Sequence, residues 1–561
     1  MDHDSVKRLF PPCRLACPAH VNIQAYVSLV SNGRFSEALE VIRKQNPFPA
    51  VCGRVCFSPC EEECQRNNVD SPVSIRLLKR LVADIEFSSE RAARAEPVPR
   101  RWEERIAVVG SGPSGLTAAY ELVKMGYHVT VFEREPKPGG MLRSCLPLYR
   151  LPEDVLDAEI RFIIDSGVDI KTNVEIGEDI PFDDLWTQGF KVVFVATGAP
   201  RSLSLRIEGE DLEGVFQALD FLRIAHSEDL ELRGRVAVIG GGDVAIDSAR
   251  TAIRLGPEDV TVIYRRQRGE MPARAKEVDE AEREGVNFEF LASPTRILGL
   301  GRVSGIECVR MRLGELDDSG RRHPIRILDS EFELPVDFVV EAIGETADLS
   351  FLFGDIATRW RTIEADPTTC ETNIARVFAG GDVVTGPASV IDAIASGRRA
   401  ARAIDLYLRG GNLDALREEE LEETSWVKKE TALERKSKQE EAHIPVEARR
   451  CNFSEVELGL TQTQGMIEAL RCLHCGPCSE CLVEEDLCEH ESPEVDTKDC
   501  SGCGTCVTIC PFDVMEKDED GIAKVNEDAC KGCGICAASC PERAITIGGL
   551  TGGLMIEAVA D

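Results

Sequence analysis

The stretch RIAVVGSGPSGLTAAYELVKMGYHVTVFERE, residues 105–135, decides how the centre of this chain folds. An apolar strand at 106–109 meets a G-x-G-x-x-G turn and then a helix, and a second strand at 128–132 ends in an acid 23 residues after the first glycine. Such glycines allow a pyrophosphate to approach the helix N-terminus, and the acid accepts hydrogen bonds from ribose hydroxyls. The pattern predicts a dinucleotide-binding βαβ unit with Gly110, Gly112, Pro113, Ser114, Gly115 and Glu133 at the cofactor.

Residues 235–273, RVAVIGGGDVAIDSARTAIRLGPEDVTVIYRRQRGEMPA, repeat this design. Tyr264 stands where the first copy has its acid, and Arg265, Arg266 and Arg268 follow it. Guanidinium groups pair with a 2′-phosphate, which favours NADPH over NADH, although a solvated basic face is the alternative explanation. The residues predicted at this second turn are Gly240, Gly242, Asp243, Val244 and Ala245.

Three further motifs accompany the two turns: VVFVATGAP (192–200), VVEAIGETAD (339–348) and RVFAGGDVVTGPASVIDAIASGRRAA (376–401). With them the chain resembles the flavoprotein reductases that have two dinucleotide-binding domains. The resemblance implies FAD together with NADPH or NADH, and an FAD domain interrupted by an inserted NAD(P) domain. It also implies cofactor contacts at Ala196, Thr197, Gly198, Gly344, Gly381 and Asp382.

Twenty of the 23 cysteines fall in two terminal blocks, six between Cys13 and Cys64 and fourteen between Cys451 and Cys540. A secreted disulfide framework would be small and would follow a signal peptide, and neither feature is found here. We therefore expect metal-bound thiolates in a reducing, cytoplasmic compartment.

The runs CSGCGTCVTICP (500–511) and CKGCGICAASCP (530–541) both follow the bacterial [4Fe–4S] pattern C-x2-C-x2-C-x3-C-P. In this pattern the fourth cysteine of each run ligates the other cluster, so two clusters are predicted. One would be held by Cys500, Cys503, Cys506 and Cys540. The other would be held by Cys530, Cys533, Cys536 and Cys510. A zinc ribbon has no use for the third cysteine or for the Cys-Pro pair.

Just upstream, RCLHCGPCSECLVEEDLCE (471–489) has a cluster-like spacing that matches no single pattern. Its cysteines are Cys472, Cys475, Cys478, Cys481 and Cys488. A further [4Fe–4S] cluster is one interpretation, and a zinc site that uses His474 or His490 is the other. Cys451 stands alone and is expected to be a packed or exposed thiol.

The N-terminal block begins with PPCRLACPAH (11–20), which offers only two thiolates where a cluster needs four. Its candidate ligands are Cys13, Cys17, Cys52, Cys56, Cys60 and Cys64. The last four recur every fourth residue, but Gly53 and Pro59 interrupt a single helix. Ligation from loops is therefore favoured over a helical stripe.

The segments NPFPAVCGRVCFSPCEEEC (46–64), GGMLRSCLPLYRLP (139–152), GGGDVAID (240–247) and YRRQRGEMPA (264–273) resemble the small subunit of glutamate synthase. They also resemble the flavin segment of dihydropyrimidine dehydrogenase and the large subunit of ferredoxin-dependent NADPH transhydrogenase. The resemblance spans about residues 10–410 and adds Gly140, Met141 and Arg150 to the expected cofactor contacts. It implies an N-terminal helical domain with at least one cluster.

By this resemblance, Cys17, Cys56 and Cys60 are three ligands of the cluster nearer the flavin. The family's fourth ligand is a carboxylate or amide, but the matching residue here is Lys79, which cannot ligate iron. Cys52 or Cys13 would have to substitute.

The family's other N-terminal cluster combines positions matching Cys13 and Cys64 with an upstream C-x2-C, and no cysteine precedes Cys13 here. That upstream segment resembles EALRCLHCG (468–476). One hypothesis is that the tail folds back, so that Cys472 and Cys475 complete the site. The default is a single N-terminal cluster drawn from the six N-terminal cysteines.

The 561 residues include 65 Lys plus Arg and 98 Asp plus Glu, a net charge of −33. Such an acidic surface argues against nucleic acid and anionic membranes as partners. We find no apolar run of about 18 residues, so membrane insertion is not expected.

The expected fold is multidomain. It consists of an all-α Fe–S domain (1–102), a Rossmann-like FAD domain (103–225 and 345–410), a Rossmann-like NAD(P) domain (226–344), a helical linker (411–470) and an α+β ferredoxin-like domain (471–561).

A flavin converts hydride into single electrons for clusters, which requires no general acid or base, so we nominate no catalytic residue. The predicted function is electron transfer between NAD(P)H and a partner redox enzyme through FAD and [4Fe–4S] clusters. The alternatives are a stand-alone NAD(P)H:ferredoxin oxidoreductase, a glutamate synthase small subunit and a non-enzymatic redox sensor. A homodimer is compatible with the sequence.

Overall fold

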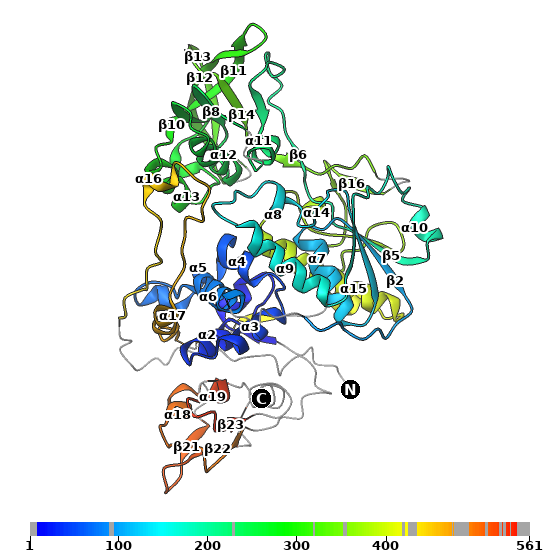
Figure 1. Ribbon diagram of the computed structural model, residues 1–561, viewed down its shortest axis with the longest axis vertical. Helices are drawn as coiled ribbons and strands as arrows, with labels where there is room; N and C mark the ends of the chain where they lie inside the picture. Colours follow the sequence, from blue (N-terminus) through cyan, green and yellow to red (C-terminus); the bar gives the residue numbers. More distant parts are fainter. Residues whose placement is uncertain are drawn as a thin grey trace.

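The computed structural model describes residues 8–88, 95–226, 230–317, 320–351, 356–417, 421–423, 435–473, 475, 493–510, 514–526, 530, 535–538 and 540–546. In Figure 1 the region that contains the second glycine turn and the ferredoxin-like region lie at opposite ends of the long axis. The sheet that contains the first glycine turn, here called the flavin-type sheet, and the N-terminal helices lie between them. No described helix has the length and the apolar character needed to cross a bilayer.

The first sheet is parallel, with strand order β18-β5-β2-β3-β4. Its strands are β2 (Arg105–Val109), β3 (His128–Glu133), β4 (Asp169–Thr172), β5 (Phe190–Val195) and β18 (Val377–Ala379). Helix α7 (Pro113–Lys124) starts where β2 ends and packs against α15 (Val390–Leu408). The other helices around this sheet are α8 (Met141–Ser144), α9 (Glu153–Asp165), α10 (Asp184–Thr187) and α14 (Asp382–Thr385). Because β18 and α15 come late in the chain, two separated segments build this layer.

The second sheet is also parallel, with strand order β10-β9-β8-β14-β7. Its strands are β7 (Val215–Gln217), β8 (Arg235–Ile239), β9 (Asp259–Tyr264), β10 (Asn287–Phe290) and β14 (Phe338–Glu341). The helices beside it are α11 (Ala218–Ala225), α12 (Asp243–Arg254) and α13 (Ala275–Arg283). A separate antiparallel sheet packs against it, made of β11 (Ala292–Gly299), β12 (Val303–Leu316) and β13 (Arg322–Leu334).

The boundary expected at 225/226 differs from the structure. Strand β7 pairs in parallel with β14, and Val215 lies opposite Val339, so β7 belongs to the second sheet. Helix α11 packs beside this sheet, in contact with β7 and β14. The chain crosses between the sheets where β6 (Arg201–Ser202) pairs with β15 (Glu345–Thr346). We therefore propose that the inserted domain begins after residue 202. The sequence did not show this, because a three-residue strand without a glycine turn carries little signal.

The N-terminal domain is built from the helices α1 (Pro12–Ala16), α2 (Ile23–Ser31), α3 (Phe35–Arg43), α4 (Pro49–Val55), α5 (Pro59–Glu62) and α6 (Ile75–Ser88). Pro49 and Pro59 begin their helices, where the missing N–H has no partner to lose. The expected break between Cys52 and Cys64 is confirmed, since α4 ends at Val55 and α5 starts at Pro59. The expectation that the ligands come from loops is wrong for three of the six cysteines, because Cys13 lies in α1, Cys52 in α4 and Cys60 in α5.

Helix α4 packs unusually closely on α6 at Gly53. A Cβ built on Gly53 would lie 2.6 Å from the Cα of Arg80. We expect Gly53→Ala to lower the free energy of unfolding by about 1–3 kcal/mol, the usual cost of overpacking, despite the better helix propensity of alanine. Chemical denaturation measures this, with Gly269→Ala as the control because its Cβ meets nothing within 4 Å. An unchanged Gly53→Ala midpoint would contradict the tight packing.

The expected helical linker is wrong for most of its described part, which has no regular secondary structure. We name residues 435–473 the strap; it contains the short helix α16 (Val446–Arg449) and the longer α17 (Gln462–Ala469). In Figure 1 the strap runs from the second-sheet region to the N-terminal helices. Before the strap lie η3 (Leu413–Leu416) and β19 (Leu421–Glu423), which pairs with β1 (Arg8–Phe10).

Ion pairs with distant partners hold the strap in place. Glu455 lies 2.8 Å from Arg54 and 2.9 Å from Arg80. Glu457 pairs with Arg76 at 2.9 Å and with Lys276 at 2.5 Å, which ties the N-terminal domain to the second-sheet region. These partners lie too far away in sequence to be found by pattern.

The ferredoxin-like region has two helices, α18 (Thr505–Ile509) and α19 (Ile535–Ala538). Its strand pairs are β20 (Glu494–Val495) with β23 (Ile545–Thr546) and β21 (Met515–Lys517) with β22 (Ala523–Val525). Helix α19 packs on α2, and Arg34 Nη1 donates to the carbonyl oxygen of Ala537 at 3.2 Å. The two Fe–S regions are therefore in contact.

Candidate flavin, nucleotide and iron–sulfur sites

The first glycine turn has no room for side chains at two of its three glycines. A Cβ on Gly110 would lie 2.5 Å from the Ala196 carbonyl oxygen, and one on Gly115 would lie 2.0 Å from the Gly110 oxygen. Gly112 is different, because its Cβ would meet nothing within 4 Å. Its backbone borders open space, as the approach of a pyrophosphate requires.

That space is a cavity of about 560 Å³. Of the expected flavin-side residues it is lined by Gly110, Gly112, Pro113, Ser114, Glu133, Gly140, Met141, Arg150, Ala196, Thr197, Gly198, Gly381 and Asp382. Within the described structure, Ser114 Oγ, Thr197 Oγ1 and Asp382 Oδ1 are buried without a hydrogen-bond partner. Unsatisfied polar atoms of this kind fit the ribityl and phosphate oxygens of FAD.

Two carboxylates of this cavity are held differently. Glu133 is already engaged, since its carboxylate accepts hydrogen bonds from the backbone N–H groups of Ser111 (3.0 Å) and Glu135 (2.9 Å). Burial raises the pKa of Asp382 to about 7. A hydroxyl group that donates to Asp382 would lower this pKa, because the hydrogen bond stabilises the charged form.

The second turn repeats the geometry. A Cβ on Gly240 would lie 2.1 Å from the Ala342 carbonyl oxygen, whereas one on Gly242 would meet nothing within 4 Å. Ala245 takes the place of the third glycine and is fully buried. Asp243 and Val244 reach the same cavity as the first turn. Gly344 begins the return to the first sheet, just before β15.

The cationic residues expected near the nucleotide have different surroundings. Arg150 pairs with Asp247 at 2.5 Å and is held at the cavity wall. Arg266 is buried and pairs with Asp317 at 2.6 Å, away from solvent. Arg265 is exposed beside it. Of the two neighbouring arginines, Arg265 is therefore the one accessible to a 2′-phosphate.

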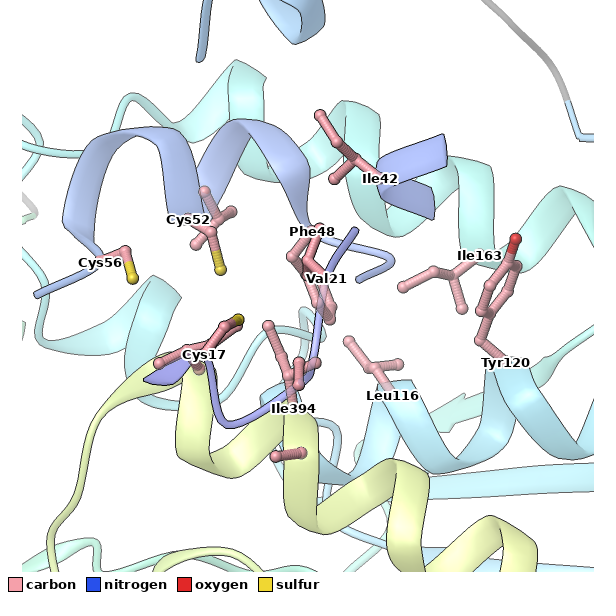
Figure 2. Packing of buried hydrophobic residues seen from close by; sticks show 14 of the residues in the cluster. Cys17, Val21, Ile42, Phe48, Cys52, Cys56, Leu116, Tyr120, Ile163 and Ile394 are labelled. Atoms are coloured by element: carbon pink, nitrogen blue, oxygen red, sulfur yellow. The ribbon is translucent and has the colours of Figure 1, made fainter. Parts of the chain in front are cut away.

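Four N-terminal cysteines form a buried group, which we name set A: Cys17, Cys52, Cys56 and Cys60. Figure 2 shows Cys17, Cys52 and Cys56 around a common space, beside Leu116 and Ile394 of the flavin-type region. Lys79 is buried near them. Burial alone would lower the pKa of Lys79, but nearby thiolates raise it above its usual value. In order of effect these are Cys56, Cys52, Cys17 and Cys60.

Set A bears on the question of the fourth ligand. Cys52 lies within this group as a neighbour of Lys79, which makes it the candidate for the thiolate that Lys79 cannot supply. Its helix is fixed from the flavin side, because both Glu159 carboxylate oxygens accept hydrogen bonds at the N-terminus of α4, from Ala50 N (2.6 Å) and Val51 N (3.0 Å). Burial raises the pKa of Glu159 to about 7.

The ferredoxin cysteines gather as their spacing predicts, as far as they are described. Cys500, Cys503, Cys506 and Cys540 line one hollow, so the ligand from the second run joins three from the first. Burial raises the pKa of Cys536 to about 12, and the nearby thiolates Cys510 and Cys530 act in the same direction. Cys533, Cys478, Cys481, Cys488, His474 and His490 lie outside the described residues.

The cysteine groups differ from a mononuclear zinc site. Four thiolates on zinc, with bonds of about 2.3 Å, bring their sulfurs to about 3.8 Å of one another. Among the residues described, the trio of metal-binding side chains with ligand atoms within 4.8 Å is Glu441, His443 and Glu457. No described cysteine belongs to it, so no three of the described thiol sulfurs lie as close together as a four-thiolate zinc site requires. Arg76 and Lys276 already neutralise those glutamates.

Two dinucleotide turns facing one cavity, with clustered thiolates beside it, define an iron–sulfur flavoprotein of the NAD(P)H oxidoreductase class. Four family models agree: dihydropyrimidine dehydrogenase domain II, 4Fe-4S cluster (residues 7–91), NAD(P)-binding Rossmann-like domain (108–170), pyridine nucleotide-disulphide oxidoreductase (154–397) and 4Fe-4S dicluster domain (492–547). FAD, NAD(P)H and [4Fe–4S] clusters are therefore its cofactors.

Curated relatives give the family. The chain is 43% identical over 499 residues to the beta subunit of NADP(+)-dependent formate dehydrogenase of Moorella thermoacetica, covering 83% of this chain and 70% of that one. It is 40% identical to the beta subunit of NADPH-Fe(3+) oxidoreductase of Geobacter sulfurreducens (84% and 76%). It is 36% identical to the glutamate synthase [NADPH] small chain of Halomonas elongata (71% and 88%). The chain belongs to the glutamate synthase small-chain-like family of iron–sulfur flavoprotein oxidoreductases.

Proposed function

We propose that this protein is the NAD(P)H-side subunit of a larger redox enzyme, and that it exchanges electrons with its partner through the ferredoxin-like region. The Moorella and Geobacter relatives are both named as beta subunits, which supports a partner chain. The contact between Arg34 and the backbone of Ala537 supports a continuous path from the N-terminal domain to that region.

One observation carries the proposal. Val55 and Phe57 line the flavin-type cavity, and Cys56 between them belongs to set A. A cluster held by set A would thus share a wall with the flavin. When bound, FAD supplies the conversion between hydride transfer and single-electron transfer. The work of the surrounding residues is positioning: glycine turns admit the phosphates, and Glu133, Thr197 and Asp382 hold the polar parts of the flavin nucleotide.

An anaerobic titration tests the path. NADPH should bleach the flavin absorption of the whole protein and then reduce its clusters, which is followed by EPR. If the flavin bleaches while no cluster is reduced, the path is wrong. Affinity capture under the same conditions distinguishes the two functions. A subunit should be captured with a stoichiometric partner polypeptide that is a redox enzyme, whereas a stand-alone NAD(P)H:ferredoxin oxidoreductase should be captured without one.

The exposed Arg265 is proposed to bind the 2′-phosphate. A lost hydrogen bond to a charged group costs about 1.5–3 kcal/mol, so Arg265→Ala should raise KM for NADPH roughly 10- to 150-fold. KM for NADH should stay within about twofold, because NADH has no 2′-phosphate. Steady-state kinetics with both nucleotides measure this. Arg268→Ala is the control, since Arg268 already pairs with Asp279 and Glu282. Equal effects on both nucleotides would contradict the assignment.

A further inference from the structure

The end of the strap returns to the N-terminal domain and is built into it. Helix α17 packs on α2 and α6, and a Cβ on Gly465 would lie 2.1 Å from Leu81. The Glu468 carboxylate is fully buried and accepts hydrogen bonds from the backbone N–H groups of Ser74 and Gln439, both at 2.8 Å. Helix α17 is therefore part of the N-terminal core.

Arg471 fixes the chain directly before Cys472. Its guanidinium is fully buried and donates to Asp70 Oδ1 at 3.0 Å and to the Ser71 carbonyl oxygen at 2.6 Å. In return, Arg66 Nη1 donates to the Arg471 carbonyl oxygen at 2.9 Å. These contacts join the residues just after Cys64 to the residue just before Cys472.

Cys13 meets this junction from the other side. Helix α1, which carries Cys13, packs on α5, whose end lies two residues before Cys64. Cys13 and Cys475 are both buried, and Cys472 packs against the same core. The thiols of Cys475, Cys472, Cys60 and Cys64 all lie near Cys13.

We propose that Cys13, Cys64, Cys472 and Cys475, which we name set B, together hold a [4Fe–4S] cluster that ties the tail to the N-terminal domain. Cys472 and Cys475 fall between the segments matched by the two Fe–S family models, 7–91 and 492–547. The competing assignment is a tail cluster that uses Cys472 and Cys475 without Cys13.

The position of set B gives the cluster a role. Cys60 of set A is a neighbour of Cys13 in set B, and the same domain contacts the ferredoxin-like region through Arg34. The cluster would be the relay between the flavin-side cluster and the ferredoxin clusters. This relay role rests on the proposed function, but the two proposals are tested separately. The NADPH titration of the unaltered protein tests the electron path, and the iron counts test the ligands of set B.

The test is an iron and sulfide count per FAD in the anaerobically purified full chain. Cys13→Ala leaves three thiolates and should lose at least one of the four irons of this cluster, whereas the double variant C472A/C475A should lose about four, the content of one cluster. The triple variant that combines them should lose the same four, because all three positions serve one cluster. Cys451→Ala, which removes an exposed thiol, is the matched control and should lose no iron.

Two results would overturn the proposal: a triple variant that loses about eight irons, or a C472A/C475A variant that loses none. If the alanine variants do not retain FAD, Cys13→Ser and Cys472→Ser replace them, since a serine oxygen can keep a cluster in place. Both should alter one and the same EPR signal. If they alter different signals, the two cysteines serve different clusters and set B is wrong.

Discussion

Gly112→Val should deprive the protein of FAD, whereas Gly242→Val should leave FAD bound and prevent its reduction by NADPH. We expect each variant to weaken binding of its own nucleotide at least about 100-fold, or about 2.7 kcal/mol. The two substitutions are matched, because both glycines occupy the same position in their turns and a Cβ on either meets nothing within 4 Å.

The expectation rests on space and not on backbone strain. Gly112 has φ −70° and Gly242 has φ −90°, values that valine also adopts, so the folded chain tolerates either change. What valine adds is an isopropyl group in the open space where the backbone would meet a pyrophosphate. The phosphate then loses its contact with the helix N-terminus.

The flavin absorption per chain measures the first variant, and anaerobic bleaching by NADPH measures the second. Thermal unfolding of both should match the unaltered protein once each is compared in its FAD-free form. If Gly242→Val lost FAD while Gly112→Val retained it, the assignment of the two turns would be reversed.

Cys52→Ala should disable the flavin-side cluster. Reduction of the flavin by NADPH should then be uncoupled from reduction of the ferredoxin clusters. Set A would retain three thiolates, so its cluster should lose at least one of its four irons. Bleaching of the flavin by NADPH should proceed as before, because Cys52 lies behind the cavity wall and does not line it. Reduction of the ferredoxin clusters should slow at least about 100-fold, a barrier increase of about 2.7 kcal/mol.

Iron analysis and stopped-flow absorbance under anaerobic conditions measure the two effects separately. Cys308→Ala is the control, since Cys308 is equally buried but lies in β12, away from both cysteine sets. An unchanged iron content in Cys52→Ala would show that the fourth ligand of this cluster is another residue.

Much of the molecule could be predicted from local patterns. The two glycine turns and the ferredoxin runs each depend on residues close together in sequence. Even the exchange of the fourth cysteine between the two ferredoxin runs follows from spacing, and Cys540 indeed lies with Cys500, Cys503 and Cys506. These features could be predicted because a turn or a ligand loop is determined by its own few residues.

The sequence by itself determined the class of cofactors, since glycine and cysteine spacings are constraints of local geometry. The tertiary structure alone decided that β7 joins the second sheet, that Arg266 faces Asp317 while Arg265 stays accessible, and that Cys52 takes the place beside Lys79. It also decided that the strap docks by ion pairs and brings Cys472 to the N-terminal domain. These outcomes depend on packing and charge pairing between residues up to about four hundred positions apart, and no local pattern encodes such pairs.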